Sequence, residues 1–417
     1  MKRIFASVLA AAMALSFGFP AAAAESGSEN KIVFYVSPDG SDSAAGTEKK
    51  PFQSLARAAK AVAETEKKQN ITVYLRGGEY KITEPVSLNS ANGGAGNVSV
   101  TYASYPGETA ILDGGTNISG WEEQSGGIWR AKVLPNMHFR NLYINGKKAI
   151  RARFPNEGSF LTLPGDPDGD EIIIEKNAQL ADFQNSDPPE LCVLVEWMEK
   201  KLRIAEYSEN EAHASVKLFN EEKMALSNAP QGAKISRGRA YWLENSLDWL
   251  DCGGEWYLDR TEGYVYYMPH SYENMNEVRA EAGGAETLLK IEGTDASPVK
   301  NVTIENISFV NTGWTRPDEC RFVDIQGNSI VPKNMELAKD SQYRHSLKKD
   351  KMPGALHVLY ADNFTVKGCT FENLAAGGAV FEAGGSDITI TGNNFSGIGG
   401  NAIEIGGDYY RARKASM

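Results

Sequence analysis

The sequence predicts an all-β fold, a parallel β-helix built from stacked coils. Short runs of alternating apolar residues recur at a constant offset, 24 residues from Asn363 to Asp387 and again from Phe381 to Ile405. Gly, Asn and Asp residues separate these runs at the same intervals, as turns do in solenoid proteins. The array also extends backwards, because residues 302–309 carry the apolar pattern of a preceding coil. Coils of short parallel strands account for all three observations.

One helix and several short strands upstream of the repeat predict a cap and the first coils. Apolar residues at helical spacing predict a helix over residues 51–66, with Pro51 near its first turn. This helix would cover the open end of the solenoid, where the first coil otherwise exposes its core. Residues 25–116 are assigned to this part. Strands bounded by Gly, Asn or Pro are expected at 32–36, 71–75, 86–88, 98–102 and 110–112.

Residues 117–285 lose the coil period, which indicates an inserted β-rich domain. Irregular loops and many Trp and Tyr residues replace the regular turns. Residues 254–268 predict a β-hairpin, because a Thr-Glu-Gly turn separates two alternating strands. The solenoid resumes in residues 286–417, with an expanded loop over 315–354 on one corner. We expect this second set of coils to end partway through the array.

The first 24 residues predict export. Lys2 and Arg3 precede an apolar stretch, and residues 21–24 are small, as at the cleavage site of a bacterial-type signal peptide. The apolar stretch is shorter than the roughly 20 residues of a transmembrane helix. We therefore expect a protein secreted to the cell surface or medium, and no membrane partner.

Charge and cysteine content narrow the partners further. The formal net charge of −11 disfavours nucleic acid and anionic membranes, which both require clustered Lys and Arg. The four cysteines show no C-x-x-C spacing, and a chain of this length can bury a core without disulfides. We expect a monomer without a disulfide framework, a metal or a cofactor.

Five stretches of sequence carry a resemblance to a known family. The chain resembles secreted right-handed parallel β-helix (pectin-lyase-like) carbohydrate enzymes, in particular glycoside hydrolase family 141 and its relatives. The resemblance covers nearly all of the chain after residue 24. The stretches are YVSPDGSDSAAGTEKKPFQSLARAAKAV (35–62), YLRGGEY (74–80), YASYPGETAILDGG (102–115), LYINGKKAIRARFPN (142–156) and ENSLDWLDCGGEWYLDRTEGYVYYMP (244–269).

This resemblance implies a glycoside hydrolase that acts on a cell-wall polysaccharide or its oligosaccharides. Such enzymes use two carboxyl groups across a cleft, about 5–5.5 Å apart for retention and about 6.5–9.5 Å apart for inversion. Equivalent residues in successive coils lie about 4.7–4.9 Å apart in backbone, so a solenoid supplies such pairs readily. The resemblance further implies that the catalytic acids lie on the C-terminal coils.

Two carboxylates in the C-terminal coils are the catalytic candidates. Glu382 follows the strand at 379–381, and Asp408 lies in a Gly-Gly-Asp-Tyr turn one coil later. Tyr409 and Arg411 place an aromatic ring and a cation beside Asp408 and are candidate substrate-binding residues. An ordinary solvated turn is the competing interpretation of that cluster. Glu404 alternates with two isoleucines and is expected to point outward as a surface residue.

The expanded loop supplies the remaining binding candidates. In the resembled family the corresponding stretch borders the cleft, which implies that Trp314 and Gln326 face the substrate. His357, between two apolar residues on a strand, is a further binding candidate, and an outward wall residue is the competing interpretation.

Two other functions stay open at this point. A non-catalytic glycan-binding or surface-structural β-helix would keep the aromatic residues and lack a carboxylate pair. A polysaccharide lyase would yield an unsaturated product, although the negative net charge does not favour a polyanionic substrate. The polygalacturonase type of β-helix is disfavoured, because the sequence has no Asn-Thr-Asp, Asp-Asp or Gly-His-Gly run.

Overall fold

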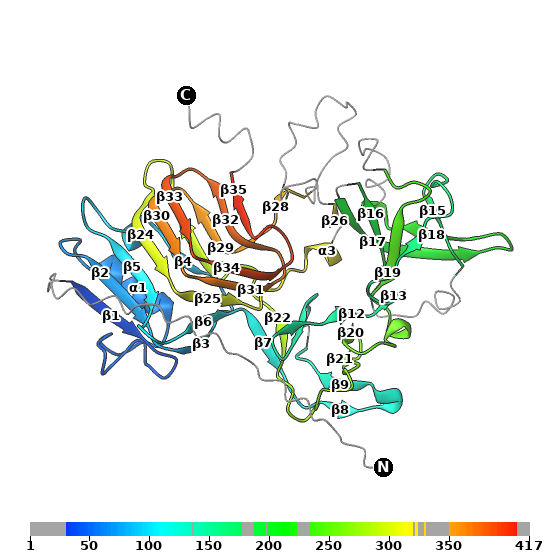
Figure 1. Cartoon of the computed structure of the whole chain (residues 1–417), viewed down its shortest axis with the longest axis horizontal. Coiled ribbons are helices and arrows are strands. Elements are labelled where there is room, and N and C mark those ends of the chain that lie inside the picture. Colours follow the sequence, from blue (N-terminus) through cyan, green and yellow to red (C-terminus); the bar gives the residue numbers. More distant parts are fainter. Residues whose placement is uncertain are drawn as a thin grey trace, which may run out of the picture.

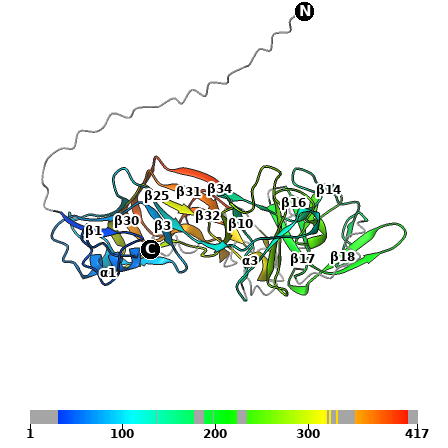
Figure 2. The same cartoon turned by 90° about the horizontal axis from the view of Figure 1, so that it is seen from below.

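The structure is a parallel β-helix with a large β-rich insertion on one side (Figure 1). The two parts lie next to each other along the longest axis of the molecule (Figure 2). Among the described residues, no helix is long and apolar enough to cross a membrane. The computed structural model describes residues 31–135, 137–176, 187–196, 198–222, 234–319, 322–323, 329–330 and 350–406.

Three parallel sheets form the faces of the β-helix. In the described residues each of five coils contributes one strand to each sheet, and the first sheet has one further strand at its edge. The first sheet contains β1 (Ile32–Val36), β2 (Ile71–Leu75), β5 (Val100–Ser104), β24 (Val299–Glu305), β30 (Ala361–Lys367) and β33 (Ser386–Thr391). The second contains β3 (Gly78–Lys81), β6 (Ala110–Asp113), β25 (Ile307–Val310), β31 (Thr370–Leu374) and β34 (Asn394–Ile398). The third contains β4 (Val86–Leu88), β23 (Leu289–Glu292), β29 (Gly354–Leu359), β32 (Gly377–Ala383) and β35 (Ile403–Ile405).

The 24-residue offset predicted from the sequence equals the spacing of paired residues in successive coils. Phe371 pairs with Phe395 and Ala379 with Ile403, so residues 24 apart in the repeat lie side by side. In the core the rings of Phe309, Phe371 and Phe395 stack on one another, with centroids 4.7 Å apart at each step. The fold class predicted from the repeat is confirmed.

Asparagines make the corners at which one coil turns into the next. Asn301, Asn363 and Asp387 occupy equivalent corners and have φ angles of 53°, 49° and 55°. This left-handed conformation suits Asn and Asp, whose short polar side chains can bond locally. The Asn363 side-chain amide also donates to Asn301 Oδ1 at 2.8 Å, which extends the stacking from the core to the corner.

The predicted cap is the helix α1 (Leu55–Glu64). Its apolar face, including Leu55, Ala58 and Val62, is buried against the first coil. The helix begins later than the sequence pattern indicates, because the Ser54 hydroxyl accepts a hydrogen bond from the Arg57 N–H and acts as the N-cap.

The insertion leaves the β-helix after β6 and returns before β23. It consists of antiparallel sheets apart from the parallel pair of β12 and β20. Its strands are β7 (Gly115–Ile118), β8 (Glu122–Glu123), β9 (Trp129–Lys132), β10 (Leu142–Ile144), β11 (Lys147–Lys148), β12 (Ile150–Arg151), β13 (Arg153–Phe154), β14 (Leu161–Thr162), β15 (Glu171–Ile174), β16 (Glu190–Val195), β17 (Met198–Glu209), β18 (Ala214–Leu218), β19 (Ala240–Glu244), β20 (Glu255–Asp259), β21 (Tyr264–Tyr267) and β22 (Ala280–Gly283). Short 3-10 turns are η1 (Ser90–Asn92) in the first coils and η2 (Ser125–Gly127) and η5 (Leu247–Trp249) in the insertion.

The predicted hairpin is present within the insertion. β20 and β21 pair antiparallel, with Trp256 opposite Tyr267 and Asp259 opposite Tyr264. Trp256 and Tyr267 are buried, so these aromatic rings belong to the core of the insertion.

The expanded loop leaves β25 and returns at β29, on the corner from which the insertion also emerges. Its described pieces are α3 (Arg316–Glu319), β26 (Phe322–Val323), β27 (Ser329–Ile330) and β28 (Asp350–Lys351). β26 pairs antiparallel with β17 of the insertion, with Phe322 opposite Lys201. The loop therefore makes a further contact between the coils and the insertion, in addition to the two places where the chain enters and leaves the insertion.

One expectation about the last described coil is wrong. Glu404 does point away from the core, but its residue is only 7% exposed, whereas Ile405 beside it is 73% exposed. The reason is Lys351, which belongs to the returning loop and forms an ion pair with the Glu404 carboxylate. The loop covers a face of the coil that the strand pattern alone assigns to solvent.

Candidate functional site

A cavity of about 460 Å³ lies where the insertion meets the coils. The coils and the expanded loop contribute Trp314, Pro317, Ala375 and Gly399 to its wall. The insertion contributes the rest, which are mostly charged: Arg140, Asn141, Lys148, Ala149, Ile150, Arg151, Arg153, Glu157, Glu199, Lys201, Trp242 and Glu244. Its volume falls within the range of about 300–1,000 Å³ that is typical of small-molecule sites.

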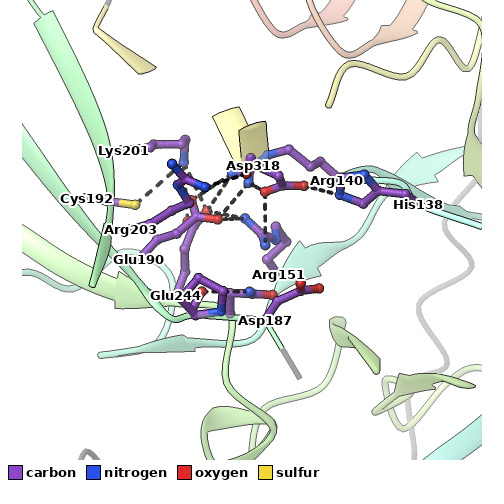
Figure 3. Close-up of polar contacts among 12 residues, drawn as sticks. His138, Arg140, Arg151, Asp187, Glu190, Cys192, Lys201, Arg203, Glu244 and Asp318 are labelled. Atoms are coloured by element: carbon purple, nitrogen blue, oxygen red, sulfur yellow. Dashed lines mark hydrogen bonds and ion pairs between the residues drawn. The ribbon is translucent and has the colours of Figure 1, made fainter. Parts of the chain in front are cut away.

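Buried ion pairs form the wall behind the cavity (Figure 3). Glu190, at the start of β16, is 1% exposed and accepts two hydrogen bonds from Arg140, at 2.7 and 2.9 Å. Arg151 Nη1 bridges two acids, at 2.9 Å from Glu190 and 3.0 Å from Glu244. Burial alone would raise the pKa of Glu190, but Arg140 and Arg151 hold it below its usual range. Strands β12, β16 and β19, together with Arg140 just before β10, thus hold a fixed set of alternating charges.

Glu244 is a member of this wall that is ionised near neutral pH. Burial opposes its charge, but Lys201, Arg151 and Arg140 together hold its pKa well below the ordinary value. Lys201 Nζ lies 3.3 Å from the carboxylate, and the Trp242 indole donates to Glu244 Oε2 at 3.0 Å. A carboxyl group with so low a pKa cannot serve as a general acid near neutral pH. Its role in this arrangement is to fix the positions of the cations.

The expanded loop is tied to this wall through Asp318. The Asp318 carboxylate accepts a hydrogen bond from Arg140 and lies 2.6 Å from His138 Nε2 (Figure 3). Arg203 donates to the Asp318 carbonyl at 3.1 Å. The loop that carries Trp314 is therefore held against the insertion by contacts to three of its side chains.

Lys148 is the cation of the cavity that lacks a partner. It is exposed, and within the part of the chain that the structure describes it has no hydrogen bond or ion pair through its side chain. Protein atoms surround it nonetheless, and this partial desolvation lowers the pKa of the ammonium group, with a further contribution from Lys201. Lys148 is thus an exposed residue that lines the cavity.

The outer face of the third sheet carries a row of polar side chains that is separate from the wall of the cavity. In register across the sheet lie Ser87, Lys290, His357 and Glu404, with the buried apolar Val380 between the last two. Val358 pairs with Phe381 and Leu359 with Ala383, so Glu382 is the extra residue of a β-bulge. Its carboxylate lies 2.9 Å from His357 Nε2. Bulges often redirect a side chain next to an active site.

The returning loop connects the wall of the cavity with the outer face of the third sheet. Trp314, whose residue is 8% exposed, lines the cavity and packs against Met352 and Ala376. Lys351, the residue before Met352, is the ion-pair partner of Glu404 on the third sheet. The cavity and the outer face of the third sheet are therefore neighbouring surfaces.

The sequence-derived candidates fall into two groups. Glu382 and His357 are in contact on the third sheet, and Trp314 lines the cavity. The other candidates, Asp408, Gln326, Tyr409 and Arg411, lie outside the described residues.

Sequence reasoning did not select the charged wall. Lys148 and Arg151 belong to the stretch LYINGKKAIRARFPN, which was used only for the resemblance. Glu190 stands at the head of the apolar strand ELCVLV, and a lone acid in such a position is a signal for a buried ion pair.

Two acidic groups have ligand atoms close enough together for a metal ion. They are Glu190, Cys192 and Glu244, and Glu79, Asp113 and Glu281. Arg140, Arg151 and Lys201 already neutralise the first group, and Lys81 and Arg279 contact the second. Arg and Lys side chains of the protein thus neutralise the acids that a metal ion would need, and we assign no metal to either group.

Family models match both parts of the molecule. Residues 126–270 match the GH141 insertion domain, and residues 34–159 match the Pel9A-like, right handed beta helix region. The chain thus carries a GH141-type insertion in a right-handed parallel β-helix, and the resemblance drawn from the motifs is confirmed.

Individual relatives agree with this assignment. A solved structure named "Glycoside hydrolase" superposes with a TM-score of 0.75 at 25% identity, over 84% of this chain and 63% of that one. A curated pectate lyase, PEL9 of Emericella nidulans, is 39% identical over 80 residues, which are 19% of this chain and 18% of the lyase. A structure of XylC with xylose has 14% identity and a TM-score of 0.39, over 92% of this chain and 44% of XylC, and carries no weight here. The chain spans less than two thirds of the length of each of these proteins.

Proposed function

We propose that the protein is a glycoside hydrolase that acts on a cell-wall polysaccharide or on oligosaccharides derived from it. The GH141-type insertion and the likeness to a solved glycoside hydrolase support this class. The proposal includes export directed by residues 1–24, as the sequence pattern predicts.

The contact between Glu382 and His357 is the observation that carries the proposal. A β-bulge aims the Glu382 carboxylate along the outer face of the third sheet, where the His357 ring contacts it at 2.9 Å. Donation from Nε2 would favour the ionised carboxylate, which suits a nucleophile or a general base better than a general acid. The second carboxyl group, which protonates the glycosidic oxygen, would be Asp408.

The cavity next to this face would hold the adjoining part of the sugar chain. Trp314 borders the cavity and connects to the third sheet through Met352 and Lys351. An aromatic ring with one exposed edge is a common contact for a sugar ring. Substrate would therefore extend from the cavity across the coil that carries Glu382.

Release of reducing ends from xylans, pectins and fucosylated glycans tests the proposal. We expect Glu382→Gln to lower the rate by at least about a hundredfold, the lower range for loss of a positioned acid or base. Glu372→Gln is the matched control, because Glu372 is exposed on the same coil but on the second sheet. Equal activity of both variants would refute the role of Glu382. Binding of glycans without any release would support a non-catalytic glycan-binding protein instead.

A polysaccharide lyase is the second candidate, since residues 34–159 match a Pel9A-like β-helix and the wall of the cavity is rich in cations. A lyase removes a proton and leaves a double bond in the product. Products that absorb in the ultraviolet would favour this candidate over hydrolysis.

A further inference from the structure

Pairing of charges around the cavity leaves one cation of the lining without a partner among the described residues. Arg140 and Arg151 are neutralised by Glu190, Glu244 and Asp318. Lys201 is paired with Glu199 at 2.9 Å and with Glu244 at 3.3 Å. These pairs account for most of the charged wall.

The remaining charged groups of the lining are Arg153, Glu157 and Lys148. Arg153 donates to the carbonyls of Pro155 and Ser159, at 2.9 and 3.0 Å. The opposite charges of Arg153 and Glu157, four residues apart, offset one another. Lys148 is therefore the lining cation whose side chain makes no ion pair or hydrogen bond within the described residues.

We propose that the cavity is a subsite for a sugar residue that bears one negative charge, with Lys148 as the group that binds it. The shared chemistry is a singly charged acidic group on the sugar ring, either a uronate carboxylate or a sulfate ester. This inference rests on the proposed function, because it specifies the substrate of the same site. It also differs from what the net charge of the whole chain suggests, since an unpaired cation in the lining can attract an anion locally.

The side chains of the wall suit a charged sugar better than a flat aromatic ligand. Arg153 lies over the Trp242 ring at 4.7 Å and Lys201 at 5.4 Å, so cations cover that ring. Trp314 offers an apolar border on the side of the coils. A sugar ring could contact this border while its acidic group reaches Lys148.

Electrostatic surroundings make the site responsive to pH. Lys201 and Arg140 disfavour the charged form of Lys148, whereas Glu244 and Glu199 favour it, and with desolvation the net effect lowers the pKa of Lys148. Affinity for the anion should therefore fall as the pH rises through this lowered value, earlier than for an ordinary lysine. A bound anion would raise the pKa again.

Calorimetric titration with defined oligosaccharides tests the subsite. The ligands are hexagalacturonate, its methyl ester, a sulfated galactose hexamer and neutral xylohexaose. The variants are Lys148→Met and the matched control Lys147→Met, which changes the other lysine of β11, a residue that does not line the cavity. Because both lysines are exposed, neither change should impair folding, and thermal melting verifies this.

We expect the unmodified protein to bind an acidic hexamer more tightly than the ester or the neutral hexamer. Lys148→Met should weaken that binding by about tenfold or more, the size of one hydrogen bond to a charged group. Lys147→Met should leave it unchanged, and the acidic ligand that is preferred identifies the carboxylate or the sulfate ester. Equal binding of both acidic hexamers and the two uncharged ligands, or equal behaviour of the two variants, would overturn the inference.

The outcomes separate this inference from the proposed function. Hydrolysis of an acidic polysaccharide at a rate that Lys148→Met does not change, with the acidic hexamers bound no more tightly than the neutral one, would refute the subsite and leave the hydrolase. Binding of the acidic hexamer through Lys148, with no release of reducing ends from any substrate, would support the subsite and refute the hydrolase.

Discussion

The β-helix and its insertion bury their side chains in different ways. In the β-helix, apolar residues stack in register from coil to coil, as the rings of Phe309, Phe371 and Phe395 do. In the insertion, charged residues from separate strands form a connected wall around Glu190. The first arrangement gives a stiff scaffold from a repeating pattern. The second places charge next to a cavity, where a ligand can use it.

Removing a ring from the stack should have the largest effect on stability. Phe371→Ala leaves a cavity between two other rings, and we expect a loss of about 3–5 kcal/mol in the free energy of unfolding of the β-helix. Urea denaturation combined with hydrogen exchange measures the loss and assigns it to the coils. Glu372→Ala, the exposed neighbour in β31, should cost much less. Similar losses for both variants would show that the ring stack does not dominate the stability of this coil.

Removing the central acid of the wall should have a comparable or slightly smaller effect, confined to the insertion. Glu190→Ala leaves Arg140 and Arg151 buried without one of their acids, which costs about 3 kcal/mol or more. The control is Glu199→Ala, where loss of the half-buried pair with Lys201, which keeps Glu244 as a second partner, should cost about 1 kcal/mol. Hydrogen exchange should show the loss of protection in the insertion. A loss in the coils instead would contradict the separate stabilisation of the two parts.

As the pH is lowered, the folded structure of the insertion should lose stability at a higher pH than that of the β-helix. The pKa values of Glu190 and Glu244 are lowered in the folded protein, so their contribution is complete above the unfolded pKa of about 4.3 and is lost as the pH falls through the lower folded values. Hydrogen exchange at pH 6 and at pH 3.5 should show a selective loss of protection in β16 and β19. In Glu190→Gln this pH dependence should be smaller. Uniform loss across both parts would argue against the wall as the acid-sensitive element.

The contact between the returning loop and the last described coil should contribute about 1 kcal/mol. Lys351→Met removes the ion pair with Glu404, whose carboxylate is largely shielded from water. Denaturation of this variant should resemble that of Glu404→Gln, and the double variant should cost no more than either alone. Additive losses would show that the two residues act independently.

A corner residue should show an effect close in size to that of the loop contact. Asn363→Ala places an alanine at a φ of 49° and removes the hydrogen bond to Asn301, and we expect a loss of about 1–2 kcal/mol. Asn363→Gly tolerates the same φ and should recover part of that loss. If glycine and alanine cost the same, backbone conformation is not the reason for asparagine at this corner.

Much of the scaffold could be predicted from the sequence, because its information is local and periodic. The offset from Phe371 to Phe395 appears directly as the register of β31 and β34. The start of α1 could not be placed as well, since it depends on one hydrogen bond of Ser54. The wall of the cavity has no local pattern at all. Its partners are far apart in sequence, 39 residues for Arg151 and Glu190 and 178 for Arg140 and Asp318.

The candidate site illustrates the same limit. Glu382 could be proposed from its place after a strand, but its contact with His357 depends on a β-bulge that the sequence does not mark. Likewise, Glu404 was expected at the surface because strand alternation says nothing about a loop that covers the strand. Lys148 becomes notable only when the surrounding charges are paired in space.

The masses of the oligosaccharides that the protein releases from pectin, xylan and fucosylated glycans test the central claim most directly. A glycoside hydrolase adds one water across each bond that it cleaves, so every product should carry the mass of a saturated oligosaccharide, and Glu382→Gln should abolish its formation while Glu372→Gln does not. Products lighter by one water, with the ultraviolet absorption of a double bond, would contradict hydrolysis and identify a lyase. A complete absence of products would contradict both.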